Sequence, residues 1–219
     1  MVKPLLKICG LRTAEQAAAV AGLGVDAIGV IGVRQSPRWV PPARRQAIWR
    51  AMGAAAPGCL GVLVVADPSD QELPQLAGGG HGVVQLHGRE SVERCRELRQ
   101  QLGLPIWKAL RVRGAADLER ALAYGPVVDA LLLDAWAPGS LGGTGQAIPL
   151  DLLATFQPPL PWWLAGGMTP ERLPQVLGRL RPNGIDASSG VEHAPGLKNL
   201  GRVIAMQEAI SGSARTPAA

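Results

Sequence analysis

The feature that most restricts the fold of this chain is a regular alternation of two patterns along its whole length. Short apolar stretches rich in β-branched residues predict strands at residues 5–9, 25–33, 59–65, 82–87, 105–110, 128–134, 161–165 and 184–189. Stretches with helical periodicity predict helices at residues 13–24, 41–55, 69–78, 90–103, 114–125, 149–156, 169–180 and 197–210. Apolar strands that alternate with helices are typical of a parallel sheet covered by helices.

Eight such strand–helix units favour a closed (β/α)8 barrel, the TIM-barrel fold, over an open doubly wound sheet, which is the alternative. No Gly-x-Gly-x-x-Gly motif follows the first predicted strand, so the dinucleotide-binding fingerprint that would favour the open sheet is missing. Barrels often form one domain at this length, and we expect residues 1–219 to form a single barrel. The small and polar residues from about residue 211 onward are expected to fray.

Composition and charge narrow the classes of function. Hydrophobic residues make up 47% of the chain and charged residues 18%, with no apolar run long enough to span a bilayer and no apolar signal core near the N-terminus. We therefore expect a cytoplasmic protein that is not bound to a membrane. The net charge of +5 is spread along the chain without a basic block, which argues against nucleic acid as a partner and leaves anionic small molecules.

The three cysteines are odd in number and widely spaced, so they fit neither a disulfide framework nor a Cys-x-x-Cys metal or redox motif. No pair of the three histidines has the spacing of metal ligands either. The sequence therefore predicts reduced thiols and no metal site.

Polar, reactive or glycine residues follow nearly every predicted strand, whereas the turns on the opposite side are plainer. In a barrel, the residues after the carboxyl ends of the strands form the functional face. In chain order they are Cys9 and Gly10, Arg34 and Arg38, Asp67, His87 and Gly88, Arg111, Asp134, Gly166 and Gly167, and Ser188, Ser189 and Gly190. The sequence thus predicts a polar site at one end of the barrel.

Glycine-rich loops late in the chain predict a phosphate site. The seventh and eighth loops of a barrel commonly hold phosphate on backbone N–H groups. Here these loops carry Gly166, Gly167, Ser189 and Gly190, and a further glycine-rich loop after the sixth strand carries Gly142 and Gly143. Any one of these loops is equally well explained as an ordinary turn, but two adjacent ones favour phosphate binding.

Cys9 and Asp134 suggest acid–base chemistry. They end the first and sixth predicted strands, so they would face each other across the barrel mouth at a separation suited to a small substrate. A lone cysteine after an apolar run is usually a packing residue, and an aspartate alone would fit a helix cap or a salt bridge. Together with Arg38 and the glycine-rich loops, they fit a site where a thiolate removes a proton and a carboxylic acid donates one. A working thiolate needs a nearby cation, and Lys7 would reach Cys9 if the strand is regular.

Seven short motifs resemble, in order and spacing, those of the phosphoribosylanthranilate isomerase family. They are KICG, RQSPRWV, VVQLHG, LLLD, LGGTG, LAGGMTPE and GIDASSGVE, and the resemblance covers about residues 5–200. It implies an aldose–ketose isomerase of tryptophan biosynthesis that performs an Amadori rearrangement. The substrate would be N-(5-phosphoribosyl)anthranilate and the product 1-(2-carboxyphenylamino)-1-deoxyribulose 5-phosphate, and no metal or cofactor is implied.

By the same resemblance, Cys9 is the general base at C2 and Asp134 is the general acid at the ring oxygen, while Arg38 pairs with the anthranilate carboxylate. The chain departs from the family pattern in the sixth loop, where Ala135 replaces the usual threonine and Gln146 replaces the usual lysine. These departures concern the details of that loop rather than the acid or the base. His87 and Arg111 lie at the functional end and receive no assigned role.

Three other functions remain as alternatives. A related histidine-pathway isomerase performs the same rearrangement with two aspartates, and the cysteine after the first strand argues against it. A non-catalytic phosphate-binding module would use the same loops without needing Cys9 or Asp134. A nucleic-acid binder is disfavoured by the dispersed charge. We expect a phosphorylated small molecule as the partner, and both a monomer and a homodimer are compatible with the sequence.

Overall fold

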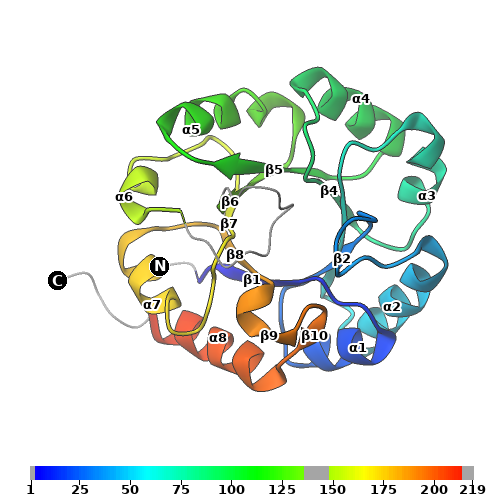
Figure 1. Ribbon diagram of the computed structural model, residues 1–219, viewed down its shortest axis with the longest axis horizontal. Coiled ribbons are helices and arrows are strands. Elements are labelled where there is room, and N and C mark those ends of the chain that lie inside the picture. The colour runs from blue at the N-terminus through cyan, green and yellow to red at the C-terminus, as the bar shows by residue number, and fades with distance from the viewer. Residues whose placement is uncertain (1–2, 136–147, 214–219) are drawn as a thin grey trace.

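A computed structural model describes residues 3–135 and 148–213 of the chain. Within these residues, eight parallel strands pair in sequence order, and β8 also pairs with β1, which closes the barrel (Figure 1). The strands are Leu5–Cys9 (β1), Ala27–Ile31 (β2), Leu60–Val65 (β3), Val83–Leu86 (β4), Ile106–Val112 (β5), Ala130–Ala135 (β6), Trp162–Leu164 (β7) and Gly184–Ala187 (β8). The predicted (β/α)8 barrel is confirmed.

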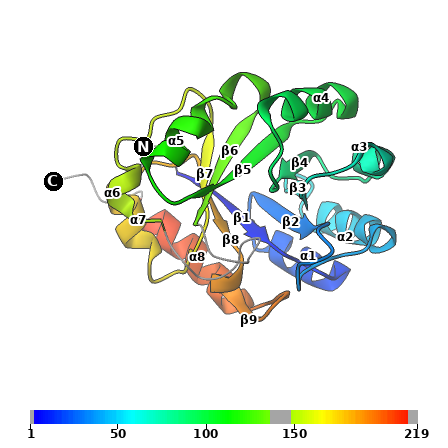
Figure 2. The ribbon, with the colours of Figure 1, turned by 45° about the horizontal axis from the view of Figure 1, so that its top comes forward.

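Helices surround the strands, as Figure 2 shows in a tilted view. Local signals set several of their ends: the side chains of Thr13 and Ser91 accept backbone N–H bonds at the starts of α1 and α4, and Gly103, with φ 61°, ends α4. The helices are Ala14–Gly22 (α1), Pro42–Ala55 (α2), Leu73–Ala77 (α3), Val92–Leu102 (α4), Ala115–Leu122 (α5), Leu150–Leu153 (α6), Leu173–Arg179 (α7) and Leu200–Ser213 (α8), with 3-10 turns at Asp70–Glu72 (η1), Gly125–Val127 (η2) and Ser189–Val191 (η3). Among the described residues, no helix has the length and hydropathy needed to cross a membrane.

The last predicted helix is wrong at its start. Leu197–Lys198 form a short strand, β10, which pairs antiparallel with Glu192–Ala194 (β9). The turn between these strands contains Gly196 at φ 81°, a conformation that glycine adopts without strain, so the chain folds back before α8 begins. At its other end, α8 continues to Ser213, and the rest of the predicted tail lies outside the described residues.

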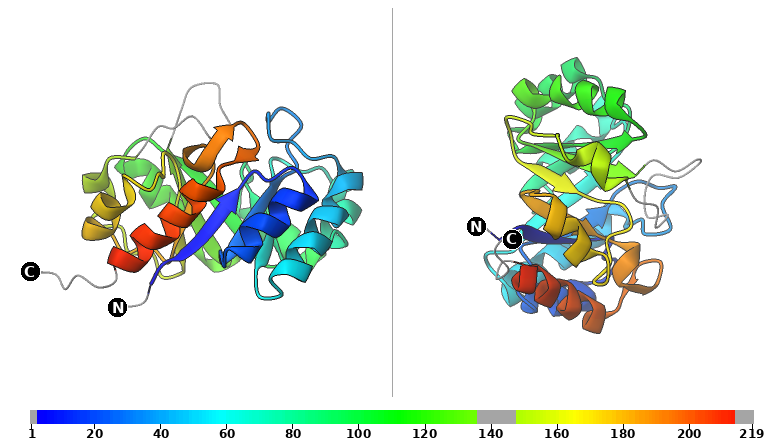
Figure 3. Two further views of the ribbon diagram at one scale, coloured as in Figure 1. Left: turned by 90° about the horizontal axis from the view of Figure 1, so that it is seen from below. Right: turned by 90° about the vertical axis from the view of Figure 1, so that its left-hand side faces the viewer.

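The two ends of the barrel interior differ in character. Trp107 and Trp163 fill the end near the amino termini of the strands, with ring centroids 4.7 Å apart, among small and aliphatic side chains. The buried polar side chains of Lys7, Gln85 and Asp186 lie further along their strands. Figure 3 shows the β9–β10 hairpin at one end of the barrel, with the start of β1 and the end of α8 at the other. The hairpin therefore marks the polar end, where a site is expected.

Candidate active site

A pocket opens at the carboxyl ends of the strands and collects most of the predicted site residues. Cys9, Arg38, Asp134, Gly166, Gly167, Ser189 and Gly190 all line it. The other lining residues are Ile31, Val33, Ser36, Val64, Ala66, Gln85, His87, Ala165, Met168, Asp186 and Ser188. The predicted residues Gly142 and Gly143 lie outside the described residues. Arg111 is not among the residues that line this pocket in the described part of the chain.

Cys9 is the last residue of β1 and lies beside a buried cation. Because side chains alternate along a strand, Lys7 points to the same inner face as Cys9, as a regular strand requires, and the two interact. Lys7 is fully buried, with Nζ 3.0 Å from Asp186 Oδ2 and 3.0 Å from Gln85 Oε1. Burial disfavours charge on Lys7, but the neighbouring Asp186 and Cys9 outweigh it and raise the Lys7 pKa.

The surroundings of Cys9 favour its neutral thiol. Burial raises the Cys9 pKa more than the cations of Lys7 and Lys198 lower it, and Asp186 adds to the increase. A further positive charge near the sulfur, or a higher pH, therefore favours the thiolate.

Gly10 explains why the first strand ends in Cys-Gly. Its φ is 89°, a backbone conformation that glycine adopts without strain. A Cβ atom at this position would lie 2.5 Å from Cδ of Arg38, so only glycine leaves room for the arginine to cross over the end of β1. The Cys-Gly sequence thus places a thiol and a guanidinium side by side.

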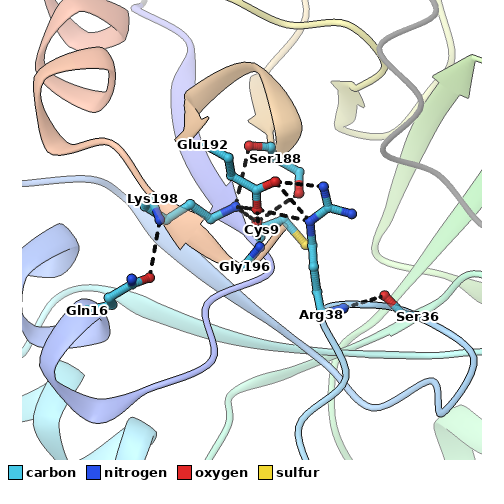
Figure 4. Close-up of polar contacts among 8 residues, drawn as sticks. All are labelled: Cys9, Gln16, Ser36, Arg38, Ser188, Glu192, Gly196 and Lys198. Atoms are coloured by element: carbon cyan, nitrogen blue, oxygen red, sulfur yellow. Dashed lines mark hydrogen bonds and ion pairs between the residues drawn. The ribbon is translucent and has the colours of Figure 1, made fainter. Parts of the chain in front are cut away.

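Arg38 is buried and held by Glu192, a carboxylate that the sequence pattern did not single out. Its Nε lies 2.9 Å from Glu192 Oε1, and its Nη2 lies 2.6 Å from Glu192 Oε2 (Figure 4). Its Nη1 has no hydrogen-bond partner within the described residues. The side edge of the guanidinium is therefore occupied by Glu192, while its end, formed by Nη1 and Nη2, still has N–H groups for a ligand carboxylate.

Glu192 is the centre of a charged cluster that ties the hairpin to β1. Besides Arg38, it accepts hydrogen bonds from Lys198 Nζ at 2.6 Å and from the Gly196 N–H at 3.0 Å. Burial alone would raise the Glu192 pKa, but Arg38 and Lys198 together lower it. Lys198 Nζ and Ser188 Oγ both donate to the carbonyl oxygen of Cys9. Within the described residues, the cluster joins Arg38 and Lys198 to one carboxylate, and burial lowers the Lys198 pKa despite the neighbouring Glu192.

Asp134 lies near the end of β6, is 5% exposed, and faces His87. His87 Nε2 is 3.4 Å from Asp134 Oδ2, and His87 Nδ1 is 3.2 Å from Gln85 Nε2. Since Gln85 also contacts Lys7, a line of polar side chains runs from the base side of the pocket to the acid side. Sequence reasoning missed this line, although Gln85 and Asp186 are polar residues inside otherwise apolar strands.

The loop after β4 is held from outside the pocket. Lys108 Nζ lies 2.6 Å from Glu90 Oε2, and both side chains are almost completely buried. Glu90 also accepts the backbone N–H groups of Asp67 and Gly88 at 2.7 and 3.1 Å. The Asp67 side chain accepts the N–H of Arg89 at 2.6 Å, so Asp67 supports this loop. The backbone beside His87 is therefore fixed by a buried ion pair.

The predicted phosphate loops line the pocket with Gly166, Gly167, Ser189 and Gly190. Arg172 Nη1 lies 3.0 Å from the carbonyl of Gly166, and Arg202 Nε lies 2.7 Å from the carbonyl of Gly190. The N–H groups of Gly166 and Gly167 have no hydrogen-bond partner in the described part of the chain. A Cβ atom at Gly190 would collide with the Met168 carbonyl oxygen, so glycine lets the seventh and eighth loops meet. Backbone amides grouped in this way suit an anion.

Among residues 3–135 and 148–213, no three His, Cys, Asp or Glu side chains are grouped so that they could hold a metal ion. The pocket is lined by a thiol, a carboxyl group, a guanidinium and the backbone of two glycine-containing loops.

Comparisons with known proteins agree on one family. A family model described as N-(5'-phosphoribosyl)anthranilate isomerase matches residues 6–209. A relative with that name from Synechococcus elongatus is 46% identical over 202 residues, which cover 92% of this chain and 93% of the relative. The crystal structure of phosphoribosylanthranilate isomerase from Thermotoga maritima has a TM-score of 0.85 and 28% identity, covering 95% of this chain and 99% of its own. A structure of such an isomerase in complex with reduced 1-(o-carboxyphenylamino)-1-deoxyribulose 5-phosphate has a TM-score of 0.81, 27% identity and the same coverage.

Proposed function

This chain belongs to the N-(5'-phosphoribosyl)anthranilate isomerase family, and we propose that Cys9 and Asp134 perform its reaction as general base and general acid. The reaction is the isomerisation of N-(5'-phosphoribosyl)anthranilate in tryptophan biosynthesis, an Amadori rearrangement of an aldosylamine to a ketose. The resemblance carried by the seven sequence motifs is thereby confirmed.

The rearrangement requires one acid and one base. Asp134 donates a proton to the furanose ring oxygen as the bond between that oxygen and C1 breaks, which leaves an iminium ion at C1. Cys9 then removes the proton from C2, and the electrons of that C–H bond form a double bond between C2 and C1. The resulting enolamine takes up a proton at C1 and loses the hydroxyl proton at C2, which gives the ketose.

The electrostatics of the pocket support this order of steps. Burial raises the Cys9 pKa, so the thiolate is disfavoured before ring opening. The iminium ion brings a positive charge next to C2, and an adjacent cation favours the thiolate. Proton donation by Asp134 thus prepares both the acidic C2–H bond and the base that removes its proton.

Two anchors for the substrate lie on different sides of the pocket. The end of the Arg38 guanidinium offers N–H groups to the anthranilate carboxylate, since Glu192 occupies the other edge. The backbone N–H groups of Gly166 and Gly167 have no partner in the described part of the chain, and with Ser189 and Gly190 of the next loop they suit the phosphate. We propose that the substrate spans these anchors with its ribose between Cys9 and Asp134.

The observation that carries this proposal is that Cys9, Asp134, Arg38 and both final loops line one pocket. The test is to mix the enzyme with freshly generated N-(5'-phosphoribosyl)anthranilate and to follow the fluorescence of the anthranilate group. We expect rapid turnover, and no turnover of the aminoaldose substrate of the related histidine-pathway isomerase. Binding of N-(5'-phosphoribosyl)anthranilate without turnover would contradict the proposal and favour a non-catalytic module.

The setting of the enzyme belongs to the same proposal. We expect it to act in the cytoplasm on a phosphorylated small molecule, without nucleic acid or membrane partners, as a monomer or a homodimer. A crystal structure of monomers generated from the dimeric phosphoribosylanthranilate isomerase of Thermotoga maritima is similar to this chain, with a TM-score of 0.80. Sedimentation of the purified chain would decide between the two states.

A further inference from the structure

We propose that Gln85 holds His87 in the neutral tautomer that carries its proton on Nε2, and that this N–H bonds the Asp134 carboxylate as Asp134 gives up its proton. His87 would then be a positioning residue for the general acid. The role of Asp134 rests on the proposed function, whereas the tautomer of His87 does not.

The first step is the orientation of the Gln85 amide. Lys7 Nζ lies 3.0 Å from Gln85 Oε1, and both side chains are buried. An ammonium group has donors and no acceptor, so it must face the oxygen of the amide and not its NH2 group. Asp186 holds Lys7 from a second side at 3.0 Å, which fixes the ammonium in place. Lys7 therefore determines which end of the amide faces His87.

The second step follows from the first. With its oxygen on Lys7, Gln85 turns its NH2 group toward His87 Nδ1 at 3.2 Å. An NH2 group is a donor, so His87 Nδ1 must accept and carries no proton. In the neutral ring the proton is then on Nε2. The Lys7–Gln85 contact and the Gln85–His87 contact thus determine the tautomer of His87 together, and neither contact would do so alone.

The third step is the direction of that proton. His87 Nε2 is buried, lines the same pocket as Asp134, and has no hydrogen-bond partner among the described residues. Its acidic neighbour is Asp134, with Oδ2 at 3.4 Å, longer than a good N–H···O bond. Catalytic hydrogen bonds are often long in empty enzymes and shorten in the reacting complex. When Asp134 becomes negatively charged, its carboxylate can accept a hydrogen bond from His87 Nε2–H.

The arrangement suits an acid that must first hold its proton and then release it. An imidazolium next to Asp134 would keep it as a carboxylate, unable to donate. A ring with a bare Nε2 would accept the proton in place of the substrate. The Nε2–H tautomer avoids both outcomes and stabilises only the state after proton transfer. The buried pair of Glu90 and Lys108 holds the backbone of this loop in place.

The first experiment observes the tautomer without using activity. Nitrogen-15 NMR of the histidine-labelled full chain at neutral pH distinguishes a protonated from an unprotonated ring nitrogen, and loss of a signal set in His87→Gln assigns His87. We expect a bare Nδ1 and a protonated Nε2 in the wild type. In Gln85→Glu, the new carboxylate accepts from the ring, so Nδ1 becomes protonated. A protonated Nδ1 in the wild type, or no change in Gln85→Glu, would overturn the proposal.

The second experiment measures the consequence for the reaction. A glutamine at position 87 can present its amide N–H where Nε2 stands, whereas the shorter asparagine cannot, so we compare kcat for His87→Gln and His87→Asn. We expect His87→Asn and Gln85→Glu to lose about 10- to 100-fold in kcat, the range for a hydrogen bond to a charged group, with partial rescue in His87→Gln.

Two matched variants control for charge and for histidine loss. Gln100→Glu makes the same charge change on the exposed face of α4, and His193→Gln removes an exposed histidine, and both should retain wild-type kcat. Equal losses in His87→Gln and His87→Asn would indicate a structural role and refute the proposal. A rise in KM at unchanged kcat would also refute it, because it would make His87 a substrate contact.

Discussion

Replacing Arg38 by alanine tests the carboxylate anchor of the pocket. The Arg38 guanidinium is buried beside Cys9 with one edge on Glu192, and its Nη1 has no hydrogen-bond partner among the described residues. Truncating one partner of a buried, hydrogen-bonded charge pair costs about 2–5 kcal/mol of binding. Affinity for a product analogue that carries the carboxylate should therefore fall by roughly 30-fold to several thousand-fold.

The fold should survive this substitution. Glu192 keeps its contacts with Lys198 at 2.6 Å and with the Gly196 N–H at 3.0 Å, so its carboxylate is not left without compensation. We expect a loss of about 1–3 kcal/mol in the free energy of unfolding, the cost of a buried acceptor that is short of one partner. Urea denaturation of Arg38→Ala measures this loss separately from binding.

The assay compares two ligands and two arginines. Ribose 5-phosphate lacks the carboxylate, so its affinity should be the same in Arg38→Ala and in the wild type. Arg34→Ala serves as the control, because Arg34 belongs to the same loop but is exposed, with its guanidinium carbon 5.8 Å from the Trp39 ring centroid. Calorimetric titration of both ligands into Arg38→Ala and Arg34→Ala gives four affinities, each of which is compared with that of the wild type. Equal losses for the two ligands would refute the carboxylate assignment, and unchanged affinity for both would remove Arg38 from the site.

Three further predictions concern the thiol, the phosphate loops and the buried ion pair. Because burial raises the Cys9 pKa, the neutral thiol stabilises the folded state below the ordinary thiol pKa of about 8.5, and this stabilisation is lost as the pH rises through the raised pKa. Alkylation of Cys9 by iodoacetamide should therefore accelerate only in alkaline solution. Fast alkylation at neutral pH would contradict a raised Cys9 pKa. A crystal grown in phosphate should show an anion on the amides of Gly166, Gly167, Ser189 and Gly190, whereas an anion bound only at surface arginines would count against these loops. Lys108→Met leaves the buried Glu90 carboxylate without its cation and should cost about 3–5 kcal/mol in urea unfolding, so a loss below about 1 kcal/mol would show that the pair does not hold the loop after β4.

Most of the fold could be predicted from the sequence because each strand is a short apolar stretch bounded by turn residues. All eight predicted strands occur in the described residues, with ends that agree to within two residues. The β9–β10 hairpin was missed since Leu197 and Lys198 continue smoothly into a helical pattern. The Pro-Gly pair at Pro195 and Gly196 was the available signal for a turn.

The candidate site, like the fold, contains residues that the sequence could predict and residues that it could not. Position after a strand was enough to select Cys9, Arg38, Asp134 and the final loops, because a barrel brings those positions together. Glu192 and Lys198 could not be found by that rule, since their partners are 154 and 189 positions away in the sequence. Gln85 and Asp186 were detectable as polar residues within apolar strands, but only the closed barrel shows that they meet Lys7.

The most direct test of acid–base catalysis by this pocket is steady-state turnover of N-(5'-phosphoribosyl)anthranilate by Cys9→Ser and Asp134→Asn, with Cys59→Ser as the control for a buried cysteine outside the pocket. General acids and bases contribute roughly 10²- to 10⁴-fold each, so kcat should fall by about that factor in each of the first two variants while the product analogue still binds. Cys59→Ser should turn over like the wild type. Wild-type turnover in either Cys9→Ser or Asp134→Asn would contradict the mechanism and remove that residue from it.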